Sequence, residues 1–240
     1  MDSKQVLKEY FGYDYFRKGQ ESIINAILAK QDTLAVMPTG AGKSICYQVP
    51  ALLLPGITIV ISPLISLMQD QVKALNDAGI QATFINSFLK DTEISEILEK
   101  AEKGAYKLIY IAPERLESHK FMSFATNSNI SMITIDEAHC ISQWGQDFRP
   151  SYLKILSFIK QLSYRPIISA FTATATEEVR NDIACVLNLE KPFIYIGSFD
   201  RPNLYFKVEF HESYCLNTQP VGYWNDTNEP VTFRKCIENC

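Results

Sequence analysis

The chain has 240 residues, of which 47% are hydrophobic and 21% charged, a composition typical of a folded globular protein that argues against extensive disorder. The 23 Lys and Arg residues against 27 Asp and Glu residues give a formal net charge of −4, so any nucleic-acid binding must be local. Apolar runs are far shorter than the ~20 residues of a bilayer-spanning helix, and the polar N-terminus does not resemble a signal peptide. We therefore expect no membrane association and reduced cysteines.

Seven short apolar runs are predicted strands, and helical patterns lie between them. The spacing of Leu64, Met68, Val72 and Leu75 is one such pattern. Strands that alternate with helices predict an α/β fold whose mainly parallel sheet has helices on both faces. The predicted strands are Thr33–Met37, Thr58–Ile61, Thr83–Ile85, Leu108–Ile111, Met132–Ile135, Ile167–Phe171 and Phe193–Ile196.

A glycine-rich loop follows the first predicted strand and precedes a predicted helix over Ile45–Leu54. Its glycines permit a tight path whose N–H groups face a phosphate, and the helix N-terminus adds positive potential. Lys43 is placed to reach the β- and γ-phosphates of a nucleotide, and Ser44 to ligate Mg²⁺. An ordinary turn is the alternative, since the first glycine of the full pattern is replaced. The loop reads Met37-Pro38-Thr39-Gly40-Ala41-Gly42-Lys43-Ser44.

Two adjacent carboxylates follow the strand Met132–Ile135, in the run Asp136-Glu137-Ala138-His139. The carboxyl ends of parallel strands are where ligands of open α/β sheets bind. Asp136 is placed to hold Mg²⁺ and Glu137 to polarise an attacking water. A helix N-cap at the strand end is the structural alternative.

With these two motifs, the chain resembles the superfamily 2 helicases, and more closely the RecQ family of ATP-dependent DNA helicases. The resemblance implies a RecA-like P-loop NTPase domain that uses ATP and Mg²⁺, with His139 among its catalytic residues. Tyr13, Arg17 and Gln20 match the family's adenine-recognition motif, in which Gln20 reads the base edge while the other two stack on the ring. It also implies DNA repair and recombination, in the cytoplasm of a bacterium or the nucleus of a eukaryote.

Three further segments are similar to family segments that contact DNA or link DNA to the nucleotide site. The segments around Ser62-Pro63 and Gln69, and around Arg115, imply contacts with the DNA backbone that do not depend on base sequence. The run Thr172-Ala173-Thr174 is similar to the segment that couples the two sites. DNA, single-stranded or forked, is therefore the expected partner.

The run from Cys140 to Tyr152 resembles the aromatic-rich loop of RecQ helicases. Trp144, Phe148 and Arg149 follow directly after the carboxylates and are candidates to stack on unpaired bases. The alternative is that both aromatic side chains are buried anchors of a long loop. Gln146 stands where the family usually has His, which puts the coupling of DNA binding to hydrolysis in question.

The predicted organisation has three parts. Residues 1–30 form an N-terminal helical segment that carries the adenine motif, and residues 31–209 form the RecA-like domain. Residues 210–240 are expected to be an atypical, poorly ordered tail, consistent with a truncated or frame-shifted end. A zinc site is the weaker reading of the tail, because its candidate ligands lack compact spacing. Those ligands are His211, Cys215, Cys236 and Cys240.

The second RecA-like domain of the family, which supplies an arginine finger, has no counterpart in the sequence. The resemblance implies 3′–5′ DNA unwinding for the full-length family, whereas this chain alone is expected to bind ATP and hydrolyse it slowly. Two other readings stay open. One is an ATP- or single-stranded-DNA-binding module with little turnover, and the other is a P-loop enzyme of another class, such as a small-molecule kinase.

Overall fold

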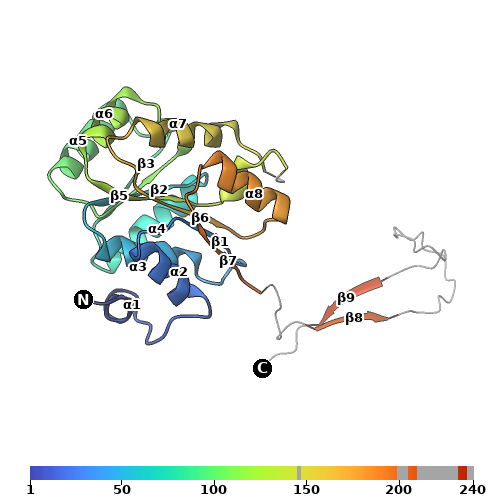
Figure 1. The fold of residues 1–240 in the computed structure, drawn as a ribbon. Coiled ribbons are helices and arrows are strands. Elements are labelled where there is room, and N and C mark those ends of the chain that lie inside the picture. Colours follow the sequence, from blue (N-terminus) through green and yellow to red (C-terminus); the bar gives the residue numbers. More distant parts are fainter. Residues whose placement is uncertain (145–146, 199–204, 210–231, 237–240) are drawn as a thin grey trace, which may run out of the picture. The chain divides into compact units, whose positions relative to one another are not determined.

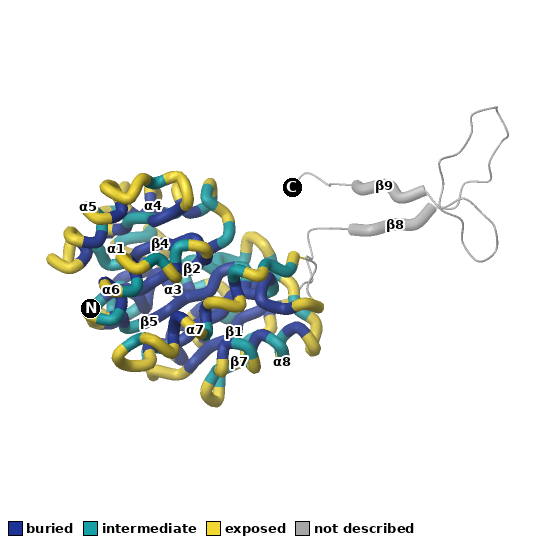
Figure 2. Tube along the Cα trace, turned by 90° about the horizontal axis from the view of Figure 1, so that it is seen from above, coloured by how far each residue is buried: buried dark blue, intermediate teal, exposed yellow. Residues whose placement is uncertain are grey.

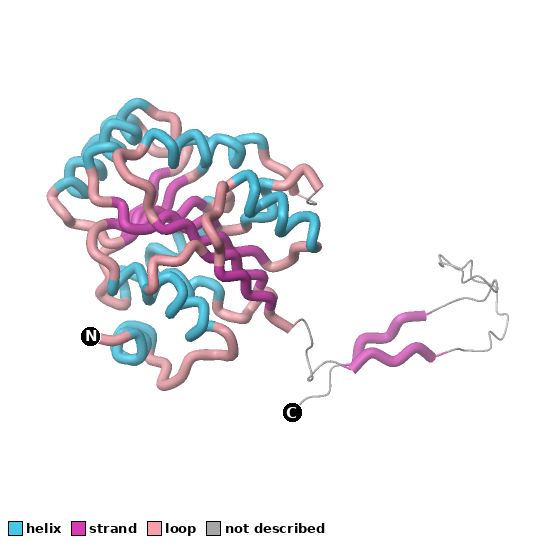
Figure 3. Tube along the Cα trace, viewed as in Figure 1, coloured by secondary structure: helices cyan, strands magenta, loops and turns pink. Residues whose placement is uncertain are grey.

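Parallel strand pairing organises the structure, a computed structural model that describes residues 1–144, 147–198, 205–209 and 232–236. The chain divides into two units, Met1–Ser198 and Phe199–Cys240. Seven strands of the first unit form one all-parallel sheet in the order β3-β4-β2-β5-β6-β1-β7 (Figure 3). They are β1 (Thr33–Val36), β2 (Ile57–Ile61), β3 (Ala82–Ile85), β4 (Leu108–Ile111), β5 (Ile130–Ile135), β6 (Ile167–Thr172) and β7 (Phe193–Ile196).

Helices cover both faces of this sheet (Figure 1). One face carries α1 (Ser3–Phe11), α2 (Gln20–Leu28), α3 (Lys43–Leu53) and α4 (Ile65–Asp77), and the other carries α5 (Asp91–Glu102), α6 (His119–Asn127), α7 (Lys154–Gln161) and α8 (Glu177–Val186). Short 3₁₀ turns follow β4, β5 and the aromatic-rich loop at η1 (Pro113–Arg115), η2 (Ala138–Ile141) and η3 (Pro150–Leu153).

Most of the core forms two apolar layers, one on each side of the sheet, and a third, smaller cluster joins α1 to α2 and α3. Figure 2 shows the buried residues in dark blue. In β2, Ile59 and Ile61 pack with the α5–α8 layer, while Val60 packs with the α2–α4 layer. Successive side chains of a strand point to opposite faces, so a strand covered on both sides is mostly apolar along its whole length. This explains why the strands read as continuous apolar runs in the sequence.

All seven predicted strands and the parallel α/β class are confirmed, with boundaries that shift by one or two residues. The helix predicted to begin at Ile45 begins at Lys43, because the loop glycine Gly42 ends the non-helical backbone directly before it. The N-terminal helical segment consists of α1 and α2.

The sequence analysis assigned no strand beyond Ile196, and the structure differs there. β8 (Tyr205–Glu209) pairs antiparallel with β9 (Thr232–Cys236) in the second unit. Each run is only five residues long and its partner is distant in sequence, so local periodicity gave no indication of the pair. The proposed tail ligands His211, Cys215 and Cys240 lie outside the described residues, as does Gln146, and the side chain of Cys236 is not described either.

A buried aspartate joins three chain segments at the amino edge of the sheet. Asp32 is 3% exposed and its carboxylate accepts hydrogen bonds from both terminal nitrogens of Arg165, at 3.1 and 2.5 Å. It also accepts from the backbone N–H groups of Ile168 and Glu190. These contacts hold the starts of β1 and β6 and the segment before β7 together, at the end of the sheet opposite the motifs described next.

Candidate nucleotide site and nucleic-acid surface

The sequence motifs meet at the carboxyl edge of four neighbouring strands, β2, β5, β6 and β1. The glycine loop follows β1, Ser62 follows β2, Asp136 follows β5, and Thr172 ends β6. The Asp136 N–H donates to the carbonyl of Ile61, and the Met37 N–H donates to the carbonyl of Thr172, so the parallel pairing carries the motifs into one row. Residues from distant parts of the chain therefore surround one cleft.

The glycine loop has the backbone geometry that its glycines allow. Gly40 and Gly42 have φ values of 84° and 81°, in the left-handed region. A Cβ atom at Gly42 would lie 2.4 Å from Nε2 of Gln20, so a larger residue there would displace the end of the Gln20 side chain. Met37, which replaces the first glycine of the pattern, is buried at the strand end and does not narrow the loop.

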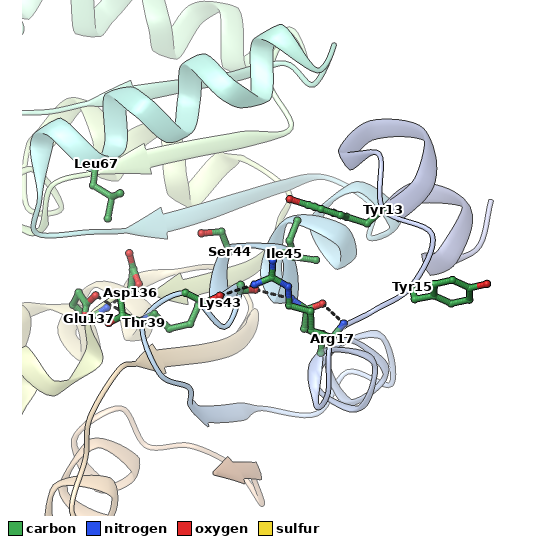
Figure 4. Close-up of a pocket in the computed structure, with 13 residues that line it drawn as sticks. Tyr13, Tyr15, Arg17, Thr39, Lys43, Ser44, Ile45, Leu67, Asp136 and Glu137 are labelled. Atoms are coloured by element: carbon green, nitrogen blue, oxygen red, sulfur yellow. Dashed lines mark hydrogen bonds and ion pairs between the residues drawn. The ribbon is translucent and has the colours of Figure 1, made fainter. Parts of the chain in front are cut away.

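Two carboxylates face the loop lysine across a cleft of about 430 Å³ (Figure 4). Oε1 of Glu137 lies 3.8 Å from Nζ of Lys43. Glu137 has a φ of 47°, a strained left-handed conformation that turns the chain sharply after β5. Asp136 is 7% exposed, and burial, followed by the charge of Glu137, raises its pKa to about 6. Ser44 and Asp136 both line the cleft and offer the oxygen ligands that Mg²⁺ prefers.

His139 connects these carboxylates to the next strand. Its Nδ1 lies 2.9 Å from Oγ1 of Thr172 and 3.3 Å from Oε2 of Glu137. The Thr172 hydroxyl donates to the carbonyl of Thr174, so it is free to accept a hydrogen bond from Nδ1–H. The hydrogen bond from His139 lowers the pKa of Glu137, which keeps this carboxylate charged. Contacts with Cys140 and with Glu137 raise the pKa of His139.

The predicted adenine-binding residues line the outer end of the same cleft. Gln20 is 3% exposed; its Nε2 donates to the carbonyls of Ala41 and Gly42, and its Oε1 accepts from the N–H of Arg17. The Arg17 guanidinium donates to the carbonyl of Gly40 at 2.6 Å. Gln20 and Arg17 thus contact the glycine loop, and they also line the part of the cleft where an adenine base is expected to bind.

One of the two aromatic side chains of the aromatic-rich loop is exposed, so it is not a buried anchor. Trp144 is 81% exposed, whereas Phe148 is partly buried. The Arg149 guanidinium donates to the carbonyl of Pro63 at 3.2 Å and to Oδ2 of Asp147 at 3.0 Å. Arg149 therefore links this loop to the segment that follows β2.

Comparison with known proteins identifies the family. A model of the DEAD/DEAH box helicases matches residues 17–182, which is more than half of the chain. The chain belongs to the DEAD/DEAH box helicases. It is 52% identical over 207 residues to the ATP-dependent DNA helicase RecQ of Bacillus subtilis, covering 86% of this chain and 35% of that protein. It is 49% identical over 203 residues to the RecQ of Pasteurella multocida, covering 85% and 32%.

The similarity to RecQ helicases expected from the sequence is confirmed, over about a third of the length of these relatives. A solved helicase domain, that of Pyrococcus furiosus Hef, superposes with a TM-score of 0.61 at 21% identity, covering 81% of this chain and 40% of that one. This likeness confirms the RecA-like helicase fold. None of the helices in the described ranges is long and apolar enough to cross a membrane.

In this DEAD/DEAH box domain, the residues expected to contact DNA are of unequal accessibility. Gln69 is exposed on α4 and Pro63 is partly exposed, but Ser62 is buried and its hydroxyl has no hydrogen-bond partner among the described residues. Arg115 donates to the carbonyls of Asn86, Ser87 and Leu89. Its guanidinium braces the loop after β3 and is already engaged there.

The cleft is also lined by three residues that were not predicted from the sequence. Tyr15, Ile45 and Leu67 line the cleft together with the predicted residues (Figure 4). Tyr15 is 87% exposed, and its position between two predicted stacking residues was the available indication in the sequence. In the sequence, Ile45 and Leu67 look like ordinary helix residues, so only the fold shows that they line the cleft. Ala173 and Thr174, which were predicted to couple the two sites, follow β6; Ala173 is partly exposed and Thr174 is exposed.

Proposed function

We propose that this chain is the ATP-binding motor domain of a RecQ-like DNA helicase, which couples ATP hydrolysis to 3′–5′ movement on DNA. The observation that carries the proposal is the cleft in which Lys43, Ser44, Asp136 and Glu137 converge from two different strands. The 52% identity to a RecQ helicase supports DNA as the substrate. We propose unwinding for a motor that also has a second RecA-like domain, because the described residues of this chain contain a single RecA-like domain.

The ATP triphosphate would lie along the glycine loop, where the N-terminus of α3 and Lys43 stabilise its negative charge. Ser44 and Asp136 would hold Mg²⁺, which supplies charge neutralisation at the phosphates. The Asp136 carboxylate accepts one hydrogen bond, from the N–H of Glu137 to Oδ1, so it keeps oxygen lone pairs for this role. Glu137, held charged between Lys43 and His139, would orient the attacking water and accept its proton.

DNA would bind at the carboxyl edge of the sheet, beside the nucleotide. Trp144 offers an exposed surface on which an unpaired base can stack, and Arg149 joins its loop to Pro63. His139 directly precedes this loop and contacts both Thr172 and Glu137. We infer that His139 and Thr172 transmit the presence of DNA to the water-positioning carboxylate.

A second candidate function is an ATP- and DNA-binding module with little turnover of its own. It is favoured by the 3.8 Å contact between Lys43 and Glu137, because this contact holds two catalytic groups to each other rather than to substrate. Binding ATP would have to separate them. Closure by a second motor domain, with its arginine finger, would then accelerate hydrolysis.

ATP hydrolysis by the purified chain, with and without single-stranded DNA, separates the two candidates. The Lys43→Ala variant tests the site, and Lys73→Ala is the matched control, because Lys73 is exposed on α4 outside the cleft. A DNA-stimulated rate that disappears in Lys43→Ala but persists in Lys73→Ala supports the motor. ATP binding without DNA-stimulated turnover supports the module, and the absence of ATP binding contradicts both.

A further inference from the structure

Three side chains of different chemistry converge beside the nucleotide cleft. The Cys140 sulfur lies 3.9 Å from Nε2 of His139 and 3.8 Å from Oδ2 of Asp147. Ligand atoms of all three residues lie within 4.8 Å of one another. His139 and Cys140 lie in and beside the Asp136–His139 motif, while Asp147 lies seven residues after Cys140, within the aromatic-rich loop. The loop therefore turns back toward its own start at this point.

The cluster combines an imidazole nitrogen, a cysteine sulfur and a carboxylate oxygen. These are the three kinds of protein ligand that bind Zn²⁺. Nδ1 of His139 already faces Thr172 and Glu137, which turns Nε2 toward the sulfur. A histidine that ligates a metal through one nitrogen usually donates the other N–H to an oxygen partner of this kind. The surroundings of His139 thus match those of a metal ligand.

We propose that His139, Cys140 and Asp147 form a binding site for a thiophilic divalent cation of the Zn²⁺ class. Tetrahedral zinc, with Zn–S near 2.3 Å and Zn–N near 2.0 Å, holds neighbouring ligand atoms about 3.3–3.7 Å apart. The Cys140 sulfur lies a few tenths of an ångström farther than this from the other two ligand atoms, and all three atoms lie within 4.8 Å of one another. The Asp147 side chain is 55% exposed, so it has room to rotate toward a bound metal. Water completes the fourth position, as in sites with three protein ligands.

Binding replaces protons and an ion pair. Coordination requires an unprotonated Nε2 and a thiolate, so the protons that these two atoms carry are released to solvent as the metal binds. It also draws Asp147 away from Arg149, whose Nη2 lies 3.0 Å from the Asp147 carboxylate. Because Arg149 connects this loop to Pro63, an occupied site would fix the loop in one position. On the proposed function, the expected consequence is inhibition of DNA-stimulated ATP hydrolysis.

Cobalt binding tests the site directly, without nucleotide or DNA, so its outcome does not depend on the proposed function. The full chain is used with Cys185, Cys215, Cys236 and Cys240 replaced by serine, which leaves two buried cysteines, Cys46 and Cys140. Co²⁺ should produce a thiolate-to-cobalt absorption band at one equivalent, and Zn²⁺ should abolish it.

Two variants and one control locate the metal. Cys140→Ala should abolish the band, and Asp147→Asn, a surface change that spares the core, should weaken cobalt binding about tenfold or more. Cys46→Ala, at the other buried cysteine, should leave the band unchanged. A band that survives Cys140→Ala, unchanged affinity in Asp147→Asn, or no band in the parent would overturn the proposal. If Cys140→Ala does not fold, the Asp147→Asn result decides.

Discussion

Nδ1 of His139 lies 2.9 Å from Oγ1 of Thr172, although the two residues come from separate segments that follow β5 and end β6. The same nitrogen lies 3.3 Å from Glu137, which we propose to orient the attacking water. A buried hydroxyl on one strand therefore helps to set the position of a catalytic group on the next. The relationship makes Thr172 a positioning residue whose role can be separated from nucleotide binding.

Thr172→Val should lower DNA-stimulated hydrolysis while leaving ATP binding nearly unchanged. The substitution keeps the shape of this buried side chain but removes the acceptor of His139, and a hydrogen bond to a charged group contributes about 1.5–3 kcal/mol. If that contribution is made in the transition state, kcat should fall by roughly ten- to a hundredfold. Steady-state kinetics, with kcat and KM determined separately, measures the effect.

Thr134→Val is the matched control for that experiment. Thr134 is buried on β5 and its hydroxyl pairs with Ser169 at 2.9 Å, so the change removes a buried threonine hydroxyl outside the cleft. It should alter stability but not the DNA-stimulated rate. Equal losses of rate in both variants would mean that Thr172 acts through stability alone.

Gln20→Ala should reduce the preference for ATP over GTP. The planar amide of Gln20 offers both a donor and an acceptor, as the adenine edge requires, once it leaves its contacts with Ala41 and Gly42. Competition binding with the two nucleotides measures the preference. If ATP and GTP affinities fall by the same factor, Gln20 serves only to brace the phosphate loop.

Trp144→Ala should weaken binding of single-stranded DNA without unfolding the domain. Base stacking on an aromatic side chain contributes about 1–3 kcal/mol per base, which predicts roughly five- to 150-fold weaker affinity. Because the side chain is 81% exposed, the melting temperature should stay the same. Fluorescence anisotropy with labelled oligonucleotides checks the affinity, and retained affinity would remove the stacking role.

Asp32→Ala should destabilise the domain without altering the chemistry at the cleft. Removing one partner of a buried ion pair costs about 3–5 kcal/mol, and here two backbone N–H groups also lose their acceptor. Urea denaturation gives the change in the free energy of unfolding. The double variant Asp32→Ala with Arg165→Leu should lose less than the sum of the single losses, because the two side chains form one contact. Additive losses would show that they act independently.

The sequence by itself determined the elements and the chemistry of the motifs. Strands covered on both faces are mostly apolar along their whole length, so β1, β2 and β4 were recognisable as local runs. The glycine loop and the Asp136-Glu137 pair were recognisable because their function requires particular residue types at fixed spacing. These are properties of short segments, which a single sequence displays directly.

Only the tertiary structure decided which of these segments meet. The strand order brings β5, β6 and β1 together, and with them Glu137, Thr172 and Lys43. Which of the predicted site residues are exposed to solvent could not be predicted from the sequence either, since Trp144 faces solvent while Ser62 is buried. Pairing between distant strands and the covering of a side chain depend on contacts between residues far apart in the chain, and no local pattern of residues encodes those contacts.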